Sequence, residues 1–206
     1  MIARSMTAEE FAEHRYELPD GGQWSELICG EAVSLHPPET AHGTVVLNLS
    51  KALADWIEQT RTGHACFELG LILSRCPDTV CCPPISYFVA GDGWAEMDKT
   101  ITGSCPALVV EVPSTPDRKR LVPGRIQQYL ERGVTVVWVV DPKQQSITVQ
   151  TSQAEPLVLS SADMLGGTAG WTSEPGCDSI LAGFSLPVEQ VFREPDWWSG
   201  RSGTSD

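Results

Sequence analysis

The chain has 206 residues, of which 41% are hydrophobic, and this is enough for one domain with a buried core. Its net charge of −13 is the reverse of what proteins that follow a phosphate backbone usually carry, and its seven cysteines are a poor disulfide framework. No window approaches the roughly 20 apolar residues of a membrane span, so we expect a cytoplasmic protein without a membrane partner, with one domain over residues 1–192 and a flexible tail over 193–206.

The N-terminal part is predicted to form a short helix and then a β-hairpin. Thr7 and Glu10 have the spacing of a capping box, in which each side chain hydrogen-bonds to the backbone of the other residue at a helix start. Residues 24–28 and 31–36 alternate apolar and polar side chains around Cys29-Gly30, which indicates two strands joined by a glycine turn.

Residues 40–61 form the clearest predicted helix. Their apolar side chains recur at intervals of three and four residues, which is typical of a helix with one buried face. Gly63 stands where a helix C-cap commonly lies.

The next part is predicted to be two strands on either side of a turn at 76–79. The first covers residues 65–74, and strict alternation would place Phe67 on one of its faces and Glu68 on the other. The second covers residues 85–89 and leads to a Gly-rich loop at 91–93.

Two valine-rich runs, 107–112 and 134–140, indicate strands covered on both sides. A helix containing Ile126 and Tyr129 is predicted between them, and we expect Pro123-Gly124 to break its start. This order of strand, helix and strand predicts a parallel crossover unit. With further strands near 146–151 and 156–159, the sequence predicts an α/β fold with a mixed central sheet flanked by helices.

Glu111 is the first residue that could carry chemistry. It lies within an apolar strand, where a carboxylate is costly unless it is paired or bound to a cation. It could instead mark the solvent-exposed end of the strand. Glu26 in the hairpin and Glu68 in the next strand have the same two interpretations, since each could face a cleft or water.

Two other groups of residues suggest binding. Cys76, Cys81, Cys82 and Cys105 could in principle hold zinc, but their spacing fits a zinc knuckle badly. Four of the 14 basic residues lie within eight positions without an acid between them, so a local phosphate-binding face is compatible with the acidic total. These residues are Arg118, Lys119, Arg120 and Arg125.

Several phrases together resemble the restriction endonuclease family sometimes called Uma-two, whose fold is that of the PD-(D/E)xK nucleases. The phrases follow the family's order over about residues 6 to 192, and Pro106-Ala-Leu-Val-Val-Glu-Val is among them. The full set covers residues 6–11, 26–31, 42–43, 68–71, 106–112, 129–134, 137–142 and 183–188.

The resemblance implies a DNA endonuclease that hydrolyses phosphodiesters with Mg²⁺ or Mn²⁺. In this family an acidic pair holds the metal, which polarises the phosphodiester and activates water, and a lysine assists. The family's Asp, Glu and Lys positions read Pro84, Glu111 and Arg125 here, and Glu26 and Glu68 match further acidic positions.

The resemblance therefore predicts that Glu111, Arg125, Glu68 and Glu26 form the catalytic set. Of these, Glu111 and Glu68 would hold the metal. The nearby Arg118, Lys119 and Arg120 would contact DNA.

Two of the three usual catalytic positions are altered, which indicates a degenerate site. Pro84 has no carboxylate, and Arg125 stays protonated, so that it can clamp a phosphate but cannot act as a base. The alternative functions are a catalytically inactive nucleic-acid-binding protein, and a protein-interaction module whose partner is another protein or a second copy of the chain.

Overall fold

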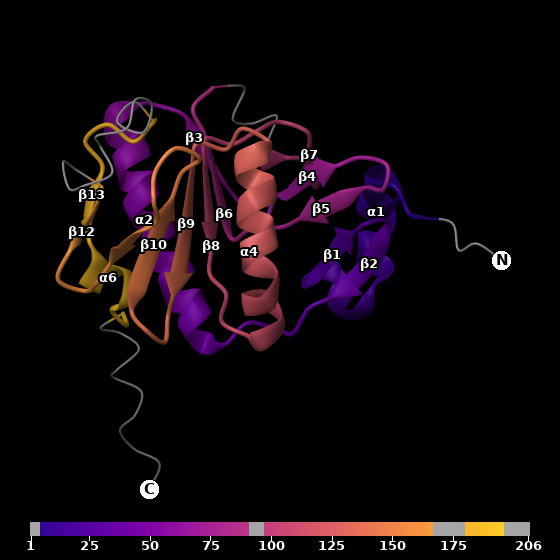
Figure 1. Ribbon diagram of the computed structural model, residues 1–206, viewed down its shortest axis with the longest axis horizontal. Coiled ribbons are helices and arrows are strands. Elements are labelled where there is room, and N and C mark those ends of the chain that lie inside the picture. The colour runs from indigo at the N-terminus through magenta and orange to yellow at the C-terminus, as the bar shows by residue number, and fades with distance from the viewer. Residues whose placement is uncertain (1–4, 91–96, 167–179, 196–206) are drawn as a thin grey trace, which may run out of the picture.

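The computed structural model describes residues 5–90, 97–166 and 180–195. Its centre is a six-stranded sheet, and Figure 1 shows helices α2 and α4 on its opposite faces. Within the described ranges, no helix combines the length and the hydropathy that crossing a membrane requires. The helices are α1 (Ala8–His14), α2 (Thr40–Thr60), α4 (Pro116–Glu131) and α6 (Val188–Phe192), with 3-10 turns η1 (Arg15–Glu17) and η2 (Pro19–Gly22).

The six-stranded sheet has the order β11-β10-β9-β8-β6-β3. Strands β8 and β9 are parallel and are joined through α4, whereas the other neighbours are antiparallel. The sheet is therefore mixed, as the sequence predicts. Its strands are β3 (His64–Phe67), β6 (Ile85–Phe88), β8 (Leu108–Glu111), β9 (Val136–Asp141), β10 (Ser146–Gln150) and β11 (Leu157–Leu159).

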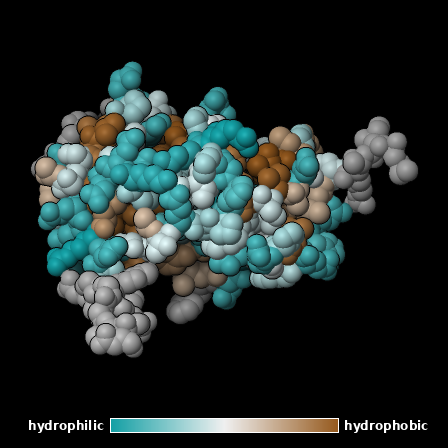
Figure 2. Space-filling view, turned by 90° about the horizontal axis from the view of Figure 1, so that it is seen from below, coloured by the Kyte–Doolittle hydropathy of each residue, from teal (hydrophilic) through white to brown (hydrophobic). Residues whose placement is uncertain are grey.

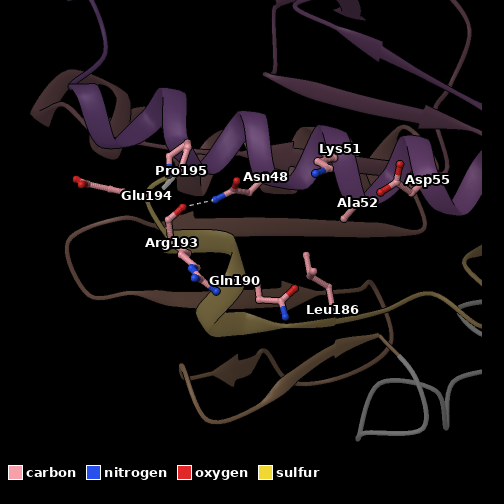
Figure 3. Close-up of a pocket in the computed structure, with 9 residues that line it drawn as sticks. All are labelled: Asn48, Lys51, Ala52, Asp55, Leu186, Gln190, Arg193, Glu194 and Pro195. Carbon is pink, nitrogen blue, oxygen red and sulfur yellow. Dashed lines mark hydrogen bonds between the residues drawn. The ribbon is translucent and has the colours of Figure 1, made fainter. Parts of the chain in front are cut away.

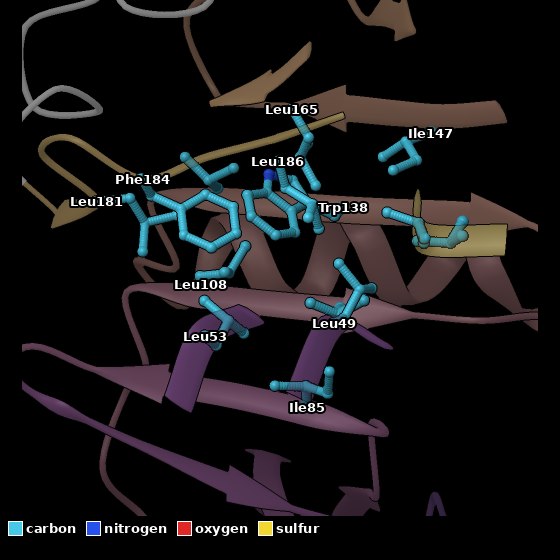
Figure 4. Close-up of a cluster of buried hydrophobic side chains, with 14 of the residues drawn as sticks. Leu49, Leu53, Ile85, Leu108, Trp138, Ile147, Leu165, Leu181, Phe184 and Leu186 are labelled. Atoms are coloured by element: carbon cyan, nitrogen blue, oxygen red, sulfur yellow. The ribbon is translucent and has the colours of Figure 1, made fainter. Parts of the chain in front are cut away.

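The main hydrophobic core lies between α2 and the sheet (Figure 4). Leu49 and Leu53 of α2 pack with the sheet residues Leu108 and Trp138, and all four are fully buried. Each buried leucine contributes roughly 1.5–3 kcal/mol relative to an exposed one. The C-terminal strands β12 (Met164–Gly166) and β13 (Ser185–Pro187) and helix α6 cover the rest of this core.

The other face of the sheet is covered by α4. Val122, Ile126 and Tyr129 form its apolar stripe, and Arg118 and Arg125 are buried on the same side of the helix. Their spacings of three and four residues place all five side chains on one face.

A second sheet, with the order β2-β1-β5-β4-β7, carries the N-terminal helix. Phe11 of α1 packs on Leu27 and Val80 of this sheet, and the capping box of Thr7 and Glu10 is present as predicted. The strands are β1 (Ser25–Ile28), β2 (Glu31–Ser34), β4 (Gly70–Ser74), β5 (Thr79–Cys81) and β7 (Ile101–Thr102).

Asp78 fastens α1 to the turn between β4 and β5. Its carboxylate accepts hydrogen bonds from the backbone N–H of Ala8 at 2.8 Å and of Cys76 at 3.1 Å, and it pairs with Arg75 at 2.8 Å. These backbone donors and the arginine hold the pKa of Asp78 below its usual value. The N-terminal helix is thus attached by polar contacts as well as by its apolar face.

The predicted C-cap at Gly63 is wrong. Arg61 caps α2 in the left-handed conformation, with φ 56°, and its N–H bonds to the carbonyl of Ile57 at 2.8 Å. Gly63 has another role, because a Cβ there would lie 2.3 Å from the carbonyl oxygen of Phe88. It permits the chain to pass close to β6.

The predicted single strand over residues 65–74 is also wrong. It divides into β3 and β4, which belong to different sheets, and the break falls at Glu68, whose φ is 52°. A left-handed residue interrupts the alternation of side chains. Phe67 is consequently exposed, whereas Leu69 and Leu71 are buried.

Helix α4 begins at Pro116 and runs through Pro123, so the break predicted at Pro123-Gly124 does not occur. Both residues lie on the exposed side of the helix, where the missing N–H and Cβ remove nothing from the core. The loop predicted at 91–93 and most of the predicted tail, residues 196–206, lie outside the described residues.

Candidate active site

Three charged side chains from three elements meet beside α4. Glu26 comes from β1, Glu111 from the end of β8, and Arg125 from the buried face of α4. Arg125 Nη2 donates to Glu26 Oε2, and its Nη1 lies 3.4 Å from both carboxylate oxygens of Glu111. One guanidinium therefore bridges the two carboxylates. We call this set the Glu26–Arg125–Glu111 cluster.

Two further groups complete the contacts of the cluster. The hydroxyl of Tyr129 donates to Glu111 Oε1 at 2.7 Å, and the backbone N–H of Cys82 donates to Glu26 Oε1 at 3.1 Å. The sequence predicts Tyr129 as a helix residue and as the start of one of the family phrases, without assigning it a role in the site. Its separation of four residues from Arg125, one helical turn, is the signal that could have placed it beside the same partner.

The cluster is sealed from solvent. Glu26, Glu111 and Arg125 are 2%, 4% and 4% exposed. Burial raises the pKa of the Glu26 carboxyl, against the lowering effect of the Arg125 charge. Burial also opposes protonation of Arg125, but the charges of Glu111 and Glu26 outweigh it and raise its pKa. Arg125 stays a cation, so the cluster carries two acids and one fixed positive charge.

Pro84 directly precedes β6, the strand that pairs with β8. Strands β6 and β8 pair Ser86 with Val109 and Ile85 with Val110. Pro84 directly precedes Ile85 in the chain, and Glu111 directly follows Val110, the partner of Ile85, so the two positions adjoin the same end of this strand pair. An acid at position 84 would stand at the end of the strand pair that leads to Glu111. The proline that stands there supplies no ligand.

These side chains do not fit a divalent metal ion. Both buried carboxylates are already bound to Arg125, and the third acidic position is Pro84. Among the residues that the structure describes, no three His, Cys, Asp or Glu side chains are grouped to hold a metal, which applies equally to the cysteines considered for zinc. The chemistry of the donors therefore favours a salt-bridged centre.

Glu68 lies near the cluster but lines a separate hollow. Its backbone N–H donates to the carbonyl of Pro84 at 3.3 Å, and its side chain is exposed on that hollow. Partial loss of hydration there raises the pKa of its carboxyl to about 7, while Arg118 and Arg15 act in the opposite direction. A carboxyl that is half neutral near pH 7 is a weak metal ligand.

The basic residues before the cluster point in different directions. Arg118 is 9% exposed, donates from Nε to the carbonyl of His36 at 3.3 Å and lies over the ring of Trp24 at 5.7 Å. Lys119 pairs with Asp141 at 3.0 Å, and Arg120 is exposed. They do not form one continuous basic face.

The beginnings of α2 and α4 lie on the lower side of the molecule in Figure 1. His36 and Asp117 join the two segments through a contact of 3.0 Å. Figure 2, which shows the molecule from below, has mostly hydrophilic residues with separate hydrophobic patches between them.

A second candidate site lies between α2 and α6 (Figure 3). Asn48 donates from Nδ2 to the carbonyls of Val191 and Arg193 at 3.1 and 2.8 Å, which fastens the two helices together. Lys51 and Asp55 also line this hollow. Its polar groups support the packing of α6 and include no arrangement of nucleophile, base or metal ligands.

The comparisons with known proteins agree with this fold. The family model described as "Uma2: Putative restriction endonuclease" matches residues 8–189. A crystal structure from Anabaena variabilis ATCC 29413, described as a putative nuclease belonging to DUF820, has a TM-score of 0.68 and 21% identity. The match covers 91% of this chain and 97% of that chain. No curated protein matches the chain.

Proposed function

The chain belongs to the Uma2 family of restriction-endonuclease-like proteins, and from that membership we propose that it is a nuclease-fold protein that has lost metal-dependent phosphodiester hydrolysis. The observation that carries this proposal is Arg125, whose guanidinium lies between Glu26 and Glu111. The positive charge that balances these two carboxylates is therefore the Arg125 side chain of the protein, in the place where a metal ion would have to bind.

The contact geometry supports the proposed loss of cleavage. A metal-dependent nuclease needs carboxylates that bind the ion and leave open positions for water and for a phosphate oxygen. In this chain both carboxylates face the arginine, and all three side chains are nearly inaccessible. An ion would have to displace a hydrogen-bonded guanidinium from a buried site, which leaves that charge unpaired at a cost of several kcal/mol.

A separate observation supports the loss of water activation. Water must lose a proton to attack a phosphodiester, and a neutral lysine or a carboxylate can take part in that transfer. Arg125 remains protonated because its two acidic partners raise its pKa. It neutralises charge inside the protein and is not presented to a substrate.

The test is cleavage of supercoiled plasmid DNA by highly purified protein with Mg²⁺ or Mn²⁺. We expect no metal-dependent nicking, and the rate with Glu111→Gln should equal that of the unaltered chain. Glu189→Gln, a change at an exposed position of α6, is the matched control. Nicking that requires the metal and disappears in Glu111→Gln but persists in Glu189→Gln would overturn the proposal.

A further inference from the structure

A hollow of about 410 Å³ lies beside the Glu26–Arg125–Glu111 cluster but outside it. Its walls come from η1, from the end of β3 and from residues 97–100, which precede β7. Its volume is within the range of small-molecule sites, roughly 300–1,000 Å³. The proposed loss of cleavage does not involve this space.

Two aromatic side chains line the hollow and are unusually exposed. Tyr16 of η1 is 74% exposed, and Phe67 at the end of β3 is 48% exposed. The core does not need these rings, whereas a planar ligand can stack on an aromatic face. Met97, which is 54% exposed, adds a flexible apolar wall.

The polar groups of the hollow are held in place. The backbone N–H of Glu68 donates to the carbonyl of Pro84 at 3.3 Å, and Glu68 is one of the residues that line the hollow. Because the pKa of this carboxyl is about 7, its neutral form is available, and that form offers one hydrogen-bond donor beside one acceptor. Arg15 is anchored by its Nε contact with the carbonyl of Gly22 at 2.9 Å.

The charges around the hollow indicate the class of ligand. Arg15 and Lys99 face Asp98 and the partly neutral Glu68, so the lining carries at most a small excess of positive charge. The whole chain carries −13, which disfavours the approach of a polyanion. A neutral, flat molecule with adjacent donor and acceptor groups on one edge matches these walls.

We propose that this hollow binds a nucleobase, carried by a free nucleoside, that stacks on Tyr16 or Phe67 and hydrogen-bonds to the Glu68 carboxyl. A nucleobase has the required planar face and a polar edge with donors and acceptors. The same base could be presented by a single strand, and the experiment separates these two sources.

The test is isothermal titration calorimetry of the full chain with adenosine, guanosine, cytidine and thymidine, and with short single-stranded oligonucleotides of each base. We expect saturable binding of at least one nucleoside. Phe67→Leu, which keeps apolar bulk but removes the ring, should weaken it by about five- to a hundredfold. Glu68→Ala, which removes both the donor and the acceptor, and Tyr16→Ala should also weaken it.

Val158→Ala changes an exposed apolar residue on β11 and should leave binding unaltered. Circular dichroism of each variant checks that it is folded. If an alanine variant does not fold, the conservative change Phe67→Leu still tests the site. If oligonucleotides bind but nucleosides do not, and the same variants weaken this binding, the hollow binds a nucleobase that belongs to a single strand and not to a free nucleoside. No binding of either at millimolar concentration, or binding indifferent to all three variants, overturns the proposal.

Discussion

Replacing Arg125 by methionine is the most direct test of the buried cluster. Methionine keeps much of the side-chain volume and removes the charge, so Glu26 and Glu111 lose their shared partner. Breaking a buried ion pair in this way costs about 3–5 kcal/mol. For a chain of this size, each kcal/mol corresponds to roughly 2–4 °C in melting temperature, so we expect a fall of about 6–20 °C.

The pH dependence separates a charge effect from a packing effect. Without Arg125, the buried Glu26 carboxyl loses the stronger of the two positive charges, Arg125 and Arg118, that oppose the rise in pKa that burial causes. A raised pKa means that the folded state holds a proton more tightly than the unfolded chain, so stability is greatest at low pH and falls as the pH rises. The deficit of Arg125→Met should be smaller at pH 5 than at pH 8.

Thermal and urea unfolding at both pH values measure the effect. Arg120→Met, at an exposed position of the same helix, should change stability by less than about 0.5 kcal/mol. Combining Glu26→Gln and Glu111→Gln with Arg125→Met should recover part of the loss, because neutral amides replace the unpaired charges. A loss below about 1 kcal/mol at pH 8 would refute the reasoning.

Three further predictions follow from other contacts. The double change Pro84→Asp with Arg125→Lys should create a Mn²⁺ site together with Glu26 and Glu111. The expected result is a rise in melting temperature on adding Mn²⁺ that the unaltered chain does not show. If no rise occurs, the site differs from an active one at further positions. The pKa of Glu68 is raised from 4.5 to about 7, so its stabilising contribution is present below pH 4.5 and is lost as the pH rises through about 7. The melting temperature of the unaltered chain, measured relative to Glu68→Gln, should therefore decline across this range of pH. Parallel melting curves for the two proteins would contradict this prediction. Asp78→Ala should cost about 1–3 kcal/mol and increase hydrogen exchange in α1, and unchanged exchange there would show that the contacts to Ala8 and Arg75 do not hold the helix.

The arrangement of helices and strands could be predicted largely because its signals are local. The capping box at Thr7, the spacing of apolar residues in α2 and the valine-rich strands β8 and β9 are all confirmed. The failures occurred where one backbone conformation overrides a pattern. Glu68 and Arg61 adopt positive φ angles that no periodicity reveals, and Pro123 is tolerated because it lies on the exposed side of α4.

The candidate site could be predicted only in part. The sequence and its resemblance to a family identified Glu26, Glu111 and Arg125, and the structure brings these three together. Their bridging by one guanidinium depends on how α4 packs against the strands, which residue spacing does not encode. The division of the basic residues follows from the same packing, since α4 buries Arg118 and Arg125 and exposes Arg120.

Glu26 and Arg125 are 99 positions apart in the chain, which has a consequence for the order of folding. Each charge remains hydrated until α4 reaches the strands, and closing so long a loop is entropically unfavourable before the core forms. We expect the ion cluster to form after the main folding barrier. Arg125→Met should then accelerate unfolding much more than it slows folding, which stopped-flow measurements in denaturant can determine. Because the cluster forms after the transition state, it would slow unfolding and so prolong the lifetime of the native state.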